Sequence, residues 1–188
     1  MQNFDVVMPD GNEKDFIEMA LRLGYKELVF LSRNINYNYT HECTGYVMGI
    51  SVKTAYLLKD QSEIHKARKN FNYVFANADR RFFEMDIDYI INSELSERQD
   101  SFHYRSTRLN QVHAKLASEN DTNIVMNFSL LLNPATRCMM LGRMMQNAEL
   151  IKKYRLRNAV FSLANTPMGM RSRAMLDALG SILCLKNA

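Results

Sequence analysis

Short apolar runs alternate with helical patterns along most of this 188-residue chain. Seven runs have the length of a strand and are rich in apolar, β-branched and aromatic residues: Phe4–Met8, Glu27–Leu31, Ile50–Leu58, Asn72–Ala76, Asp88–Asn92, Asn123–Ser129 and Asn158–Ala164. Several of these runs are almost continuously apolar, which is typical of strands that are covered on both faces. The alternation therefore predicts a parallel sheet with helices packed against it.

Helical patterns separate many of these runs. We expect helices over six segments: Glu13–Leu23, Glu63–Asn70, Arg80–Met85, Thr107–Glu119, Thr136–Tyr154 and Ser172–Leu183. Asp79 and Ser106 stand at positions where an N-cap is expected, and Gly24 follows the first helix, where a left-handed residue often closes a helix. The segment His41–Met48 shows neither pattern and predicts an irregular loop.

A parallel sheet of this kind is either open and doubly wound or closed into a barrel. Seven strands with no glycine-rich phosphate loop after the first favour closure. The chain is shorter than the roughly 250 residues of a typical eightfold barrel. We therefore expect an α/β fold, a trimmed triose-phosphate-isomerase-like barrel of about seven parallel strands. Because no Pro-, Gly- or Ser-rich linker interrupts the pattern, residues 1–188 are expected to form a single domain.

The segment Thr136–Arg157 predicts the longest helix. Six side chains fall on one apolar stripe: Met140, Leu141, Met144, Met145, Ala148 and Ile151. Arg143 lies at the border of this stripe, and Lys152 and Lys153 lie near the C-terminal end, where the helix dipole favours cations. A methionine stripe at helical spacing more often packs in a core than binds a cofactor, so we assign it to packing.

The cysteines and the hydropathy of the chain indicate where in the cell the protein is expected. Cys43, Cys138 and Cys184 are scattered and form no Cys-x-x-Cys pair, which argues against a disulfide framework or a zinc knuckle. No segment reaches the roughly 18 apolar residues of a membrane span. The first residues lack the basic and apolar regions of a secretory signal. We expect a cytoplasmic protein, or a nuclear one if the source is eukaryotic.

Charge is distributed unevenly along the chain. Residues 1–100 hold 12 Lys and Arg against 16 Asp and Glu, a net charge of −4. Residues 101–188 hold 12 against 4, a net charge of +8. A basic C-terminal portion favours a polyanionic partner such as nucleic acid, although a solvated surface or a protein-binding face remains an alternative.

Arginines cluster where the predicted strands lead into helices. In a parallel sheet all these connections emerge at one rim, and the rim should carry seven arginines: Arg80, Arg81, Arg105, Arg108, Arg137, Arg171 and Arg173. Arginines beside helix N-termini suit phosphate groups. The acidic residues Asp79, Glu84 and Asp86 lie close enough in sequence to Arg80 and Arg81 for internal ion pairs, so internal pairing and anion binding both stay open for these two arginines. Arg105, Arg108, Arg171 and Arg173 have few acidic neighbours in sequence, and for these four we favour binding.

Catalytic motifs are weak in this sequence. The four histidines, His41, His65, His103 and His113, show no His-x-His or His-Glu-x-x-His spacing, so no metal cluster is visible. The first strand ends in Met8-Pro9-Asp10, without the paired histidines that barrel metallophosphoesterases carry there. His103 and Arg105 together could act as an acid and a phosphate clamp, but no partner base is evident. We assign no catalytic residue and keep a barrel phosphoesterase or nuclease as the alternative.

Three stretches of the chain resemble the protein component 3 family of archaeal and eukaryotic ribonuclease P, the ribonucleoprotein that matures transfer RNA. They are Asp100–Arg105 followed by Leu109–Val112, Leu141–Asn147 with Lys153-Tyr154, and Ser162–Ala164 with Met170–Ser172. The run Leu-Gly-Arg-Met-Met-Gln-Asn is the most specific. The chain departs from the family pattern at Tyr104, where a second histidine is common, at Arg108, where a glycine is common, and around Cys184.

The resemblance implies a barrel of the triose-phosphate-isomerase type and an accessory role in an RNA-based enzyme. In such an enzyme the RNA, with Mg²⁺, removes 5′ leaders from precursor transfer RNA, and the subunit itself holds no cofactor and is not catalytic alone. The implied partners are ribonuclease P RNA, a small α/β ribonuclease P protein, other ribonuclease P proteins and, indirectly, precursor transfer RNA. We therefore expect RNA contacts from the seven rim arginines and Arg143, and RNA or partner contacts from His103, Lys152 and Lys153.

Overall fold

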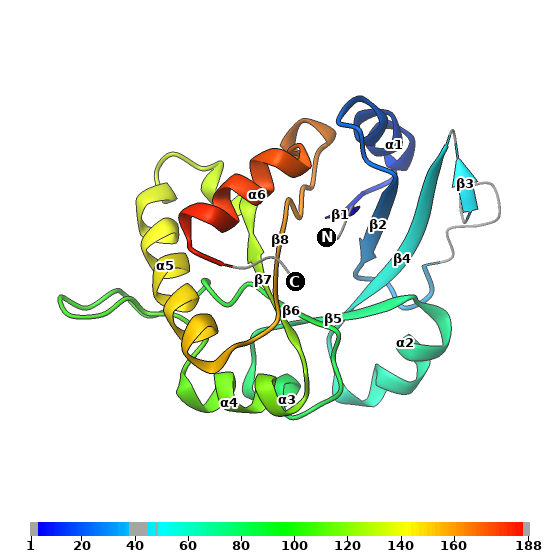
Figure 1. The fold of residues 1–188 in the computed structure, drawn as a ribbon. Coiled ribbons are helices and arrows are strands. Elements are labelled where there is room, and N and C mark those ends of the chain that lie inside the picture. The colour runs from blue at the N-terminus through cyan, green and yellow to red at the C-terminus, as the bar shows by residue number, and fades with distance from the viewer. Residues whose placement is uncertain (1–3, 38–44, 48, 186–188) are drawn as a thin grey trace.

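The computed structural model describes residues 4–37, 45–47 and 49–185 (Figure 1). Eight strands are present in this part of the chain: β1 (Phe4–Val7), β2 (Glu27–Ser32), β3 (Gly45–Val47), β4 (Ile50–Leu58), β5 (Tyr73–Asn77), β6 (Tyr89–Ile91), β7 (Asn123–Asn127) and β8 (Asn158–Phe161). The α-helices between and after them are α1 (Glu13–Arg22), α2 (Ile64–Asn70), α3 (Arg80–Phe83), α4 (Gln111–Glu119), α5 (Arg137–Tyr154) and α6 (Arg173–Ile182).

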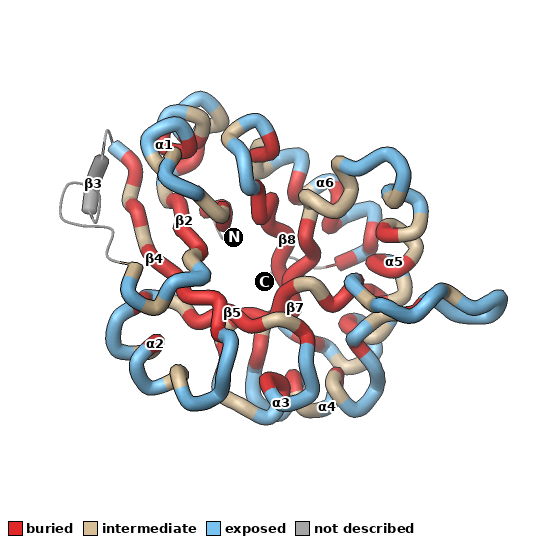
Figure 2. Tube along the Cα trace, turned by 180° about the vertical axis from the view of Figure 1, so that it is seen from behind, coloured by how far each residue is buried: buried red, intermediate tan, exposed pale blue. Residues whose placement is uncertain are grey.

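Seven of the strands are parallel and follow the order β1-β2-β4-β5-β6-β7-β8 around a nearly closed barrel. A parallel bridge between Val7 and Ala164 joins the first strand to the chain after the last. Two backbone hydrogen bonds support this seam, from Met8 to Ala164 and from Leu163 to Val6, each 2.9 Å long. The helices surround the strands in both views (Figures 1 and 2). The expected trimmed barrel of about seven parallel strands is confirmed.

Alternate side chains of the strands fill the inside of the barrel. Phe4, Phe75, Tyr89 and Phe161 meet there, with ring centroids 5.2 Å apart for Phe4 and Phe161 and 4.7 Å apart for Phe75 and Tyr89. The other face of the seven parallel strands packs against the helices, so most residues of these strands are buried (Figure 2). The barrel is therefore a packed core, and its polar surface chemistry lies at its rims and loops.

Asp5 closes the barrel seam from the helix-facing side. Its Oδ1 accepts hydrogen bonds from the backbone N–H of Val6 (2.9 Å) and of Ser162 (2.8 Å), so one carboxylate joins β1 to the end of β8. The side chain is fully buried. Burial raises the pKa of Asp5 to about 6, against the lowering effect of its Ser162 and Val6 hydrogen bonds and of the Arg173 charge.

This burial predicts a pH-dependent stability. Because the folded-state pKa of about 6 exceeds the ordinary value of 3.8, folded Asp5 binds its proton more tightly, and stability falls as the pH rises through this window. Asp5→Asn keeps the acceptor oxygen and cannot ionise. Relative to this variant, the wild type should lose about 3 kcal/mol of unfolding free energy across the window, measured by urea unfolding. If the stability of the wild type and of Asp5→Asn changed with pH in the same way, Asp5 would have the same pKa in the folded and unfolded states.

Secondary structure follows the sequence prediction with two corrections. Residues 45–47 form β3, which pairs antiparallel with β4, whereas the sequence predicted a loop over His41–Met48, whose residues 41–44 and 48 lie outside the described part. Helix α4 begins at Gln111 rather than Thr107, with Asn110 as its N-cap: the Asn110 side chain accepts from the backbone of His113 at 2.9 Å. The expected cap at Asp79 and the left-handed Gly24 are confirmed.

Ser106 explains the late start of α4. Instead of capping a helix, its backbone N–H donates to Asp100 at 2.8 Å and its Oγ lies 3.1 Å from that of Ser96. These contacts hold the chain in an extended connection that runs from the end of β6 to Asn110. The connection forms the long green loop that extends beyond α5 in Figure 1. No helix in the described part of the chain is long and apolar enough to cross a membrane.

Candidate nucleic-acid interface

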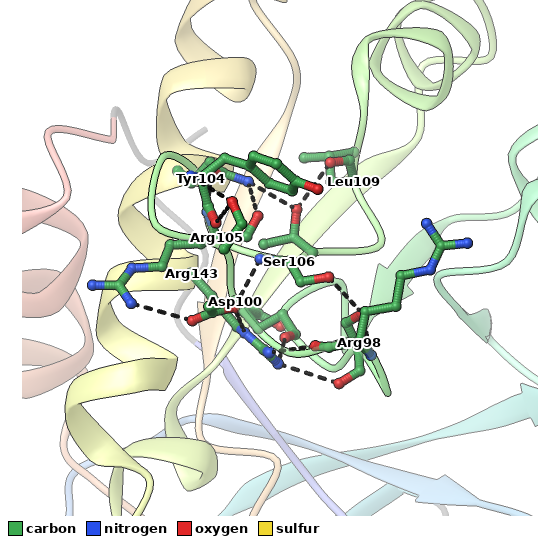
Figure 3. Close-up of polar contacts among 12 residues, drawn as sticks. Arg98, Asp100, Tyr104, Arg105, Ser106, Leu109 and Arg143 are labelled. Atoms are coloured by element: carbon green, nitrogen blue, oxygen red, sulfur yellow. Dashed lines mark hydrogen bonds and ion pairs between the residues drawn. The ribbon is translucent and has the colours of Figure 1, made fainter.

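Arg143 ties the loop after β6 to the middle of α5 (Figure 3). Its Nε donates to Asp100 Oδ1 at 2.9 Å, and its Nη atoms donate to the backbone carbonyls of Glu94 (3.1 Å), Ser96 (3.4 Å) and Arg98 (3.1 Å). Only 2% of the residue is exposed. The sequence prediction placed Arg143 among RNA-binding residues. Its guanidinium instead organises the loop, because a buried charge must satisfy its hydrogen bonds within the protein.

Asp100 is the acidic centre of the same loop. Besides Arg143, it accepts from the backbone of Ser106 (2.8 Å) and from Arg105 Nη1 (3.3 Å). Burial by itself would raise the pKa of Asp100, but the Ser106 hydrogen bond and the guanidinium of Arg143 lower it below its ordinary value. The carboxylate therefore stays ionised and holds both ends of the turn that contains residues 101–105.

Gln146, one turn after Arg143, fixes the segment of the loop that leads back toward α4. Its Oε1 accepts from the backbone N–H of Arg105 at 2.8 Å, and its Nε2 donates to the Arg105 carbonyl at 2.7 Å. Asn147 next to it donates to Ser93 Oγ at 3.0 Å. Two of the three stretches that carry the family resemblance thus contact each other directly, through side chains of α5 and the loop.

Gly142 lies where α5 passes closest to Arg105. A Cβ added at Gly142 would stand 3.1 Å from Arg105 Nε, which belongs to a flexible, half-exposed side chain. We expect Gly142→Ala to displace this side chain and to raise the unfolding free energy by roughly 0.5 to 1 kcal/mol, because alanine favours the helix. Urea unfolding measures the change, and a loss of stability would mean that Arg105 cannot give way.

The loop, the beginnings of α3 and α4, and α5 enclose a cleft of about 760 Å³. Four arginines line it, and we call it the arginine cleft: Arg80, Arg98, Arg105 and Arg108. His113 also lines it, and the acidic residues on its wall are Asp79 and Glu149. Figure 3 shows Arg98 and Arg105 on the loop after β6. The cleft therefore carries a positive excess on a surface open to solvent.

The guanidinium groups of the cleft are held loosely. Arg80 pairs with Glu84 at 3.3 Å and Arg108 with Glu97 at 3.8 Å, and both acidic partners are half to fully exposed. The Arg105 side chain is 52% exposed beside Asp100. The guanidinium of Arg98 has no hydrogen bond or ion pair within the described residues. Exposed pairs contribute little and are screened by salt, so these groups remain available to an external anion.

The remaining predicted arginines lie outside the cleft. Arg81 pairs with Asp79 at 3.6 Å, and Arg137 donates to the Leu131 carbonyl at 2.7 Å. Arg171 donates to the carbonyls of Met168 (2.9 Å) and Met170 (2.7 Å).

Arg173 differs most from expectation. It pairs with Asp177, and its side chain is only 20% exposed. Asp177 is four residues further along the chain, one helical turn after Arg173, so the pair forms only once α6 has formed. Lys152 pairs with Glu149 at 2.7 Å, and Lys153 lies 5.6 Å from the centre of the Tyr154 ring.

Two cleft residues, Arg98 and His113, were absent from the predicted interface. Arg98 lies in the loop after β6, away from the predicted helix starts from which the rim arginines were chosen. His113 packs its ring against Phe83, with centroids 4.6 Å apart, and its Nδ1 lies 2.7 Å from the Arg108 carbonyl. Because a carbonyl only accepts, Nδ1 carries the proton in this contact.

A partly buried polar layer lies at the carboxyl ends of β5 to β7. Asn92 donates to Asn77 at 2.8 Å and accepts from Asn127 at 2.9 Å. Glu94 is fully buried, and burial raises its pKa to about 7. Within the described ranges, no group of three or more His, Cys, Asp or Glu side chains is arranged to hold a metal ion.

The protein is therefore a trimmed α/β barrel whose rim carries an arginine-lined cleft. A scan against protein-family models finds no match, and a sequence search of curated proteins likewise finds no significant match.

Solved structures do resemble the chain. A chain in the cryo-EM structure of archaeal ribonuclease P with mature tRNA matches with a TM-score of 0.75 and 18% identity, over 97% of this chain and 83% of that one. Histidinol phosphate phosphatase from Lactococcus lactis, in complex with zinc, L-histidinol and phosphate, matches with a TM-score of 0.61 and 9% identity, over 98% and 95%. At these identities the likeness is one of fold.

Proposed function

We propose that this chain is a protein subunit of ribonuclease P, the endoribonuclease that removes 5′ leaders from precursor transfer RNA. In this proposal the chain binds the catalytic domain of the RNA and helps it fold, while the RNA and its Mg²⁺ carry out the cleavage. The chain binds no cofactor of its own. Its partners are ribonuclease P RNA, a small α/β protein subunit and other ribonuclease P proteins, with precursor transfer RNA as an indirect partner, in the cytoplasm or a nucleus.

The observation that carries this proposal is the convergence of Arg80, Arg98, Arg105 and Arg108 on one open cleft. Guanidinium groups recognise phosphate through paired hydrogen bonds, and an RNA backbone presents a row of phosphates to such a surface. The fold likeness to a chain of an archaeal ribonuclease P structure and the resemblance of the loop and α5 sequences support the same proposal.

Reconstitution tests the proposal. Ribonuclease P RNA and the other protein subunits are assembled with and without this chain, and precursor transfer RNA cleavage is measured over a range of Mg²⁺ concentrations. We expect cleavage to increase only when the chain is present and the chain alone to be inactive. No change at any Mg²⁺ concentration would contradict the proposal.

A phosphoesterase or nuclease acting alone is the second candidate. The observation in its favour is that His103 and Arg105 line the same hollow of about 570 Å³ on the loop. Metal-dependent turnover of phosphate esters or RNA by the purified chain, lost in His103→Ala, would support this activity. Retention of the turnover in His103→Ala would exclude His103 as its acid.

A further inference from the structure

The tip of the loop after β6 exposes aromatic rings. Phe102 is 98% exposed and Tyr104 is 65% exposed, and His103 between them is exposed as well. The rings of Phe102 and His103 meet edge to face, with centroids 5.1 Å apart. Such exposure is unfavourable for an apolar ring in water, and it is typical of a surface that another molecule covers.

The turn that carries these rings is braced rather than loose. The backbone N–H of Ser101 donates to the Tyr104 carbonyl at 3.0 Å, and the Tyr104 N–H donates to Ser101 Oγ at 3.1 Å. At the base of the turn, Asp100 and Gln146 fix the chain on both sides of Arg105, as Figure 3 shows for Asp100 and Arg105. A turn whose backbone is held in this way loses little backbone conformational entropy when a ligand binds.

Tyr104 and Arg105 connect the tip to the arginine cleft. Both residues line the cleft, and both also line the hollow of about 570 Å³ that residues 100–105 form with Gln146. A chain whose phosphates lie along the cleft arginines therefore brings its adjacent bases to the aromatic tip. The positive charge of Arg98, Arg105 and Arg108 favours a polyanion over an apolar protein surface at this place.

We propose that Phe102 and Tyr104 stack on the bases of unpaired RNA nucleotides whose phosphates occupy the arginine cleft. This inference rests on the proposed RNA-binding function and specifies the RNA element recognised. Every base has a π-face that an aromatic ring can cover, but these faces are accessible in loops and bulges and buried in a duplex. The tip therefore selects unpaired segments, while the cleft supplies affinity that does not depend on sequence.

Binding to two synthetic RNAs tests the inference. One is a hairpin with an unpaired loop that contains 2-aminopurine, and the other is a fully paired duplex with the same number of phosphates. We expect Phe102→Ala and Tyr104→Ala each to weaken hairpin binding about tenfold. Phe102 does not line the cleft, so Phe102→Ala should leave duplex binding and the salt dependence unchanged. Phe102→Trp should restore hairpin binding and the quenching of 2-aminopurine fluorescence. As a control, Ile182→Ala removes another well-exposed apolar side chain, 69% exposed, and should change the binding of neither RNA.

The outcomes separate this inference from the function on which it rests. If the wild type binds both RNAs in a salt-dependent manner but the alanine variants bind the hairpin as well as the wild type, the stacking role is wrong and the RNA-binding function stands. Equal weakening of hairpin and duplex would also overturn stacking. If the alanine variants bind both RNAs as the wild type does but no longer bind the small protein subunit, the tip is a protein contact. No salt-dependent RNA binding by the wild type would contradict the proposed function itself.

Discussion

Arg143→Met should lower the free energy of unfolding by about 3 kcal/mol, one of the two largest effects that the structure predicts. The substitution removes four hydrogen bonds from a guanidinium that is 2% exposed. It leaves the largely buried Asp100 carboxylate without its main counter-charge and leaves three loop carbonyls short of a donor. Urea unfolding of the purified chain measures the change.

A matched control is Arg157→Met. Arg157 forms an ion pair with Asp121 at 2.8 Å, but both side chains are more than half exposed, so its loss should change stability by at most about 1 kcal/mol. Arg143→Lys keeps the charge but not the planar fork and should fall between wild type and Arg143→Met. A stability loss in Arg143→Met no greater than in Arg157→Met would show that the buried pair is dispensable.

The same substitution should weaken RNA binding, although Arg143 itself faces no solvent. Arg98 and Arg105 stand on the segment that Arg143 holds, so a loosened loop no longer positions two of the four cleft arginines. Combining Arg143→Met with Asp100→Asn should be less harmful than the sum of the two single substitutions, because the second removes the unpaired charge that the first creates. Strict additivity would contradict direct coupling between the two residues.

Replacing Arg98, Arg105 and Arg108 together with alanine is expected to have the other large effect. Each phosphate contact contributes about 0.7 to 0.9 to the slope of log K against log salt, so the triple variant should flatten the slope by about 2 to 3. Affinity at low salt should fall accordingly, because fewer counterions are released on binding. RNA binding at a series of KCl concentrations gives the slope directly.

The control for this variant removes the same charge elsewhere. Arg22 and Lys69 end α1 and α2, and Lys26 precedes β2, so all three are exposed at the opposite rim from the strand-to-helix loops. Their replacement with alanine should change the salt slope by much less than the cleft triple. Equal flattening in both variants would mean that net charge, and not the arginine cleft, governs RNA binding.

Much of the framework could be predicted from local patterns. All seven expected strands form within a few residues of their predicted bounds, and the helices other than α4 begin and end within about two residues of theirs. These segments were recognisable because strand and helix periods repeat over neighbouring residues. The predicted helix start at Ser106 was wrong, because the Ser106 hydroxyl that could have capped a helix lies against the hydroxyl of Ser96 instead.

The candidate site was harder to predict. Arg80, Arg105 and Arg108 were placed on the rim from their positions after strands, and the structure brings them to one cleft. Nothing in the local sequence distinguishes them from Arg173, whose partner Asp177 follows one turn later. Arg98 was missed because it lies in a loop, away from the predicted helix starts from which the rim arginines were chosen.

The amino-acid pattern was enough to predict a parallel sheet covered by helices and to favour its closure, because alternating apolar strands and amphipathic helices can bury their apolar faces together only in a layered or closed arrangement. Which charges are paired internally and which stay exposed depends on the three-dimensional packing. Arg143 meets Asp100 across 43 residues because α5 crosses the loop after β6, and that crossing depends on the packing of the whole barrel. Burial then separates a guanidinium that must be satisfied inside from those that water and an anion can reach.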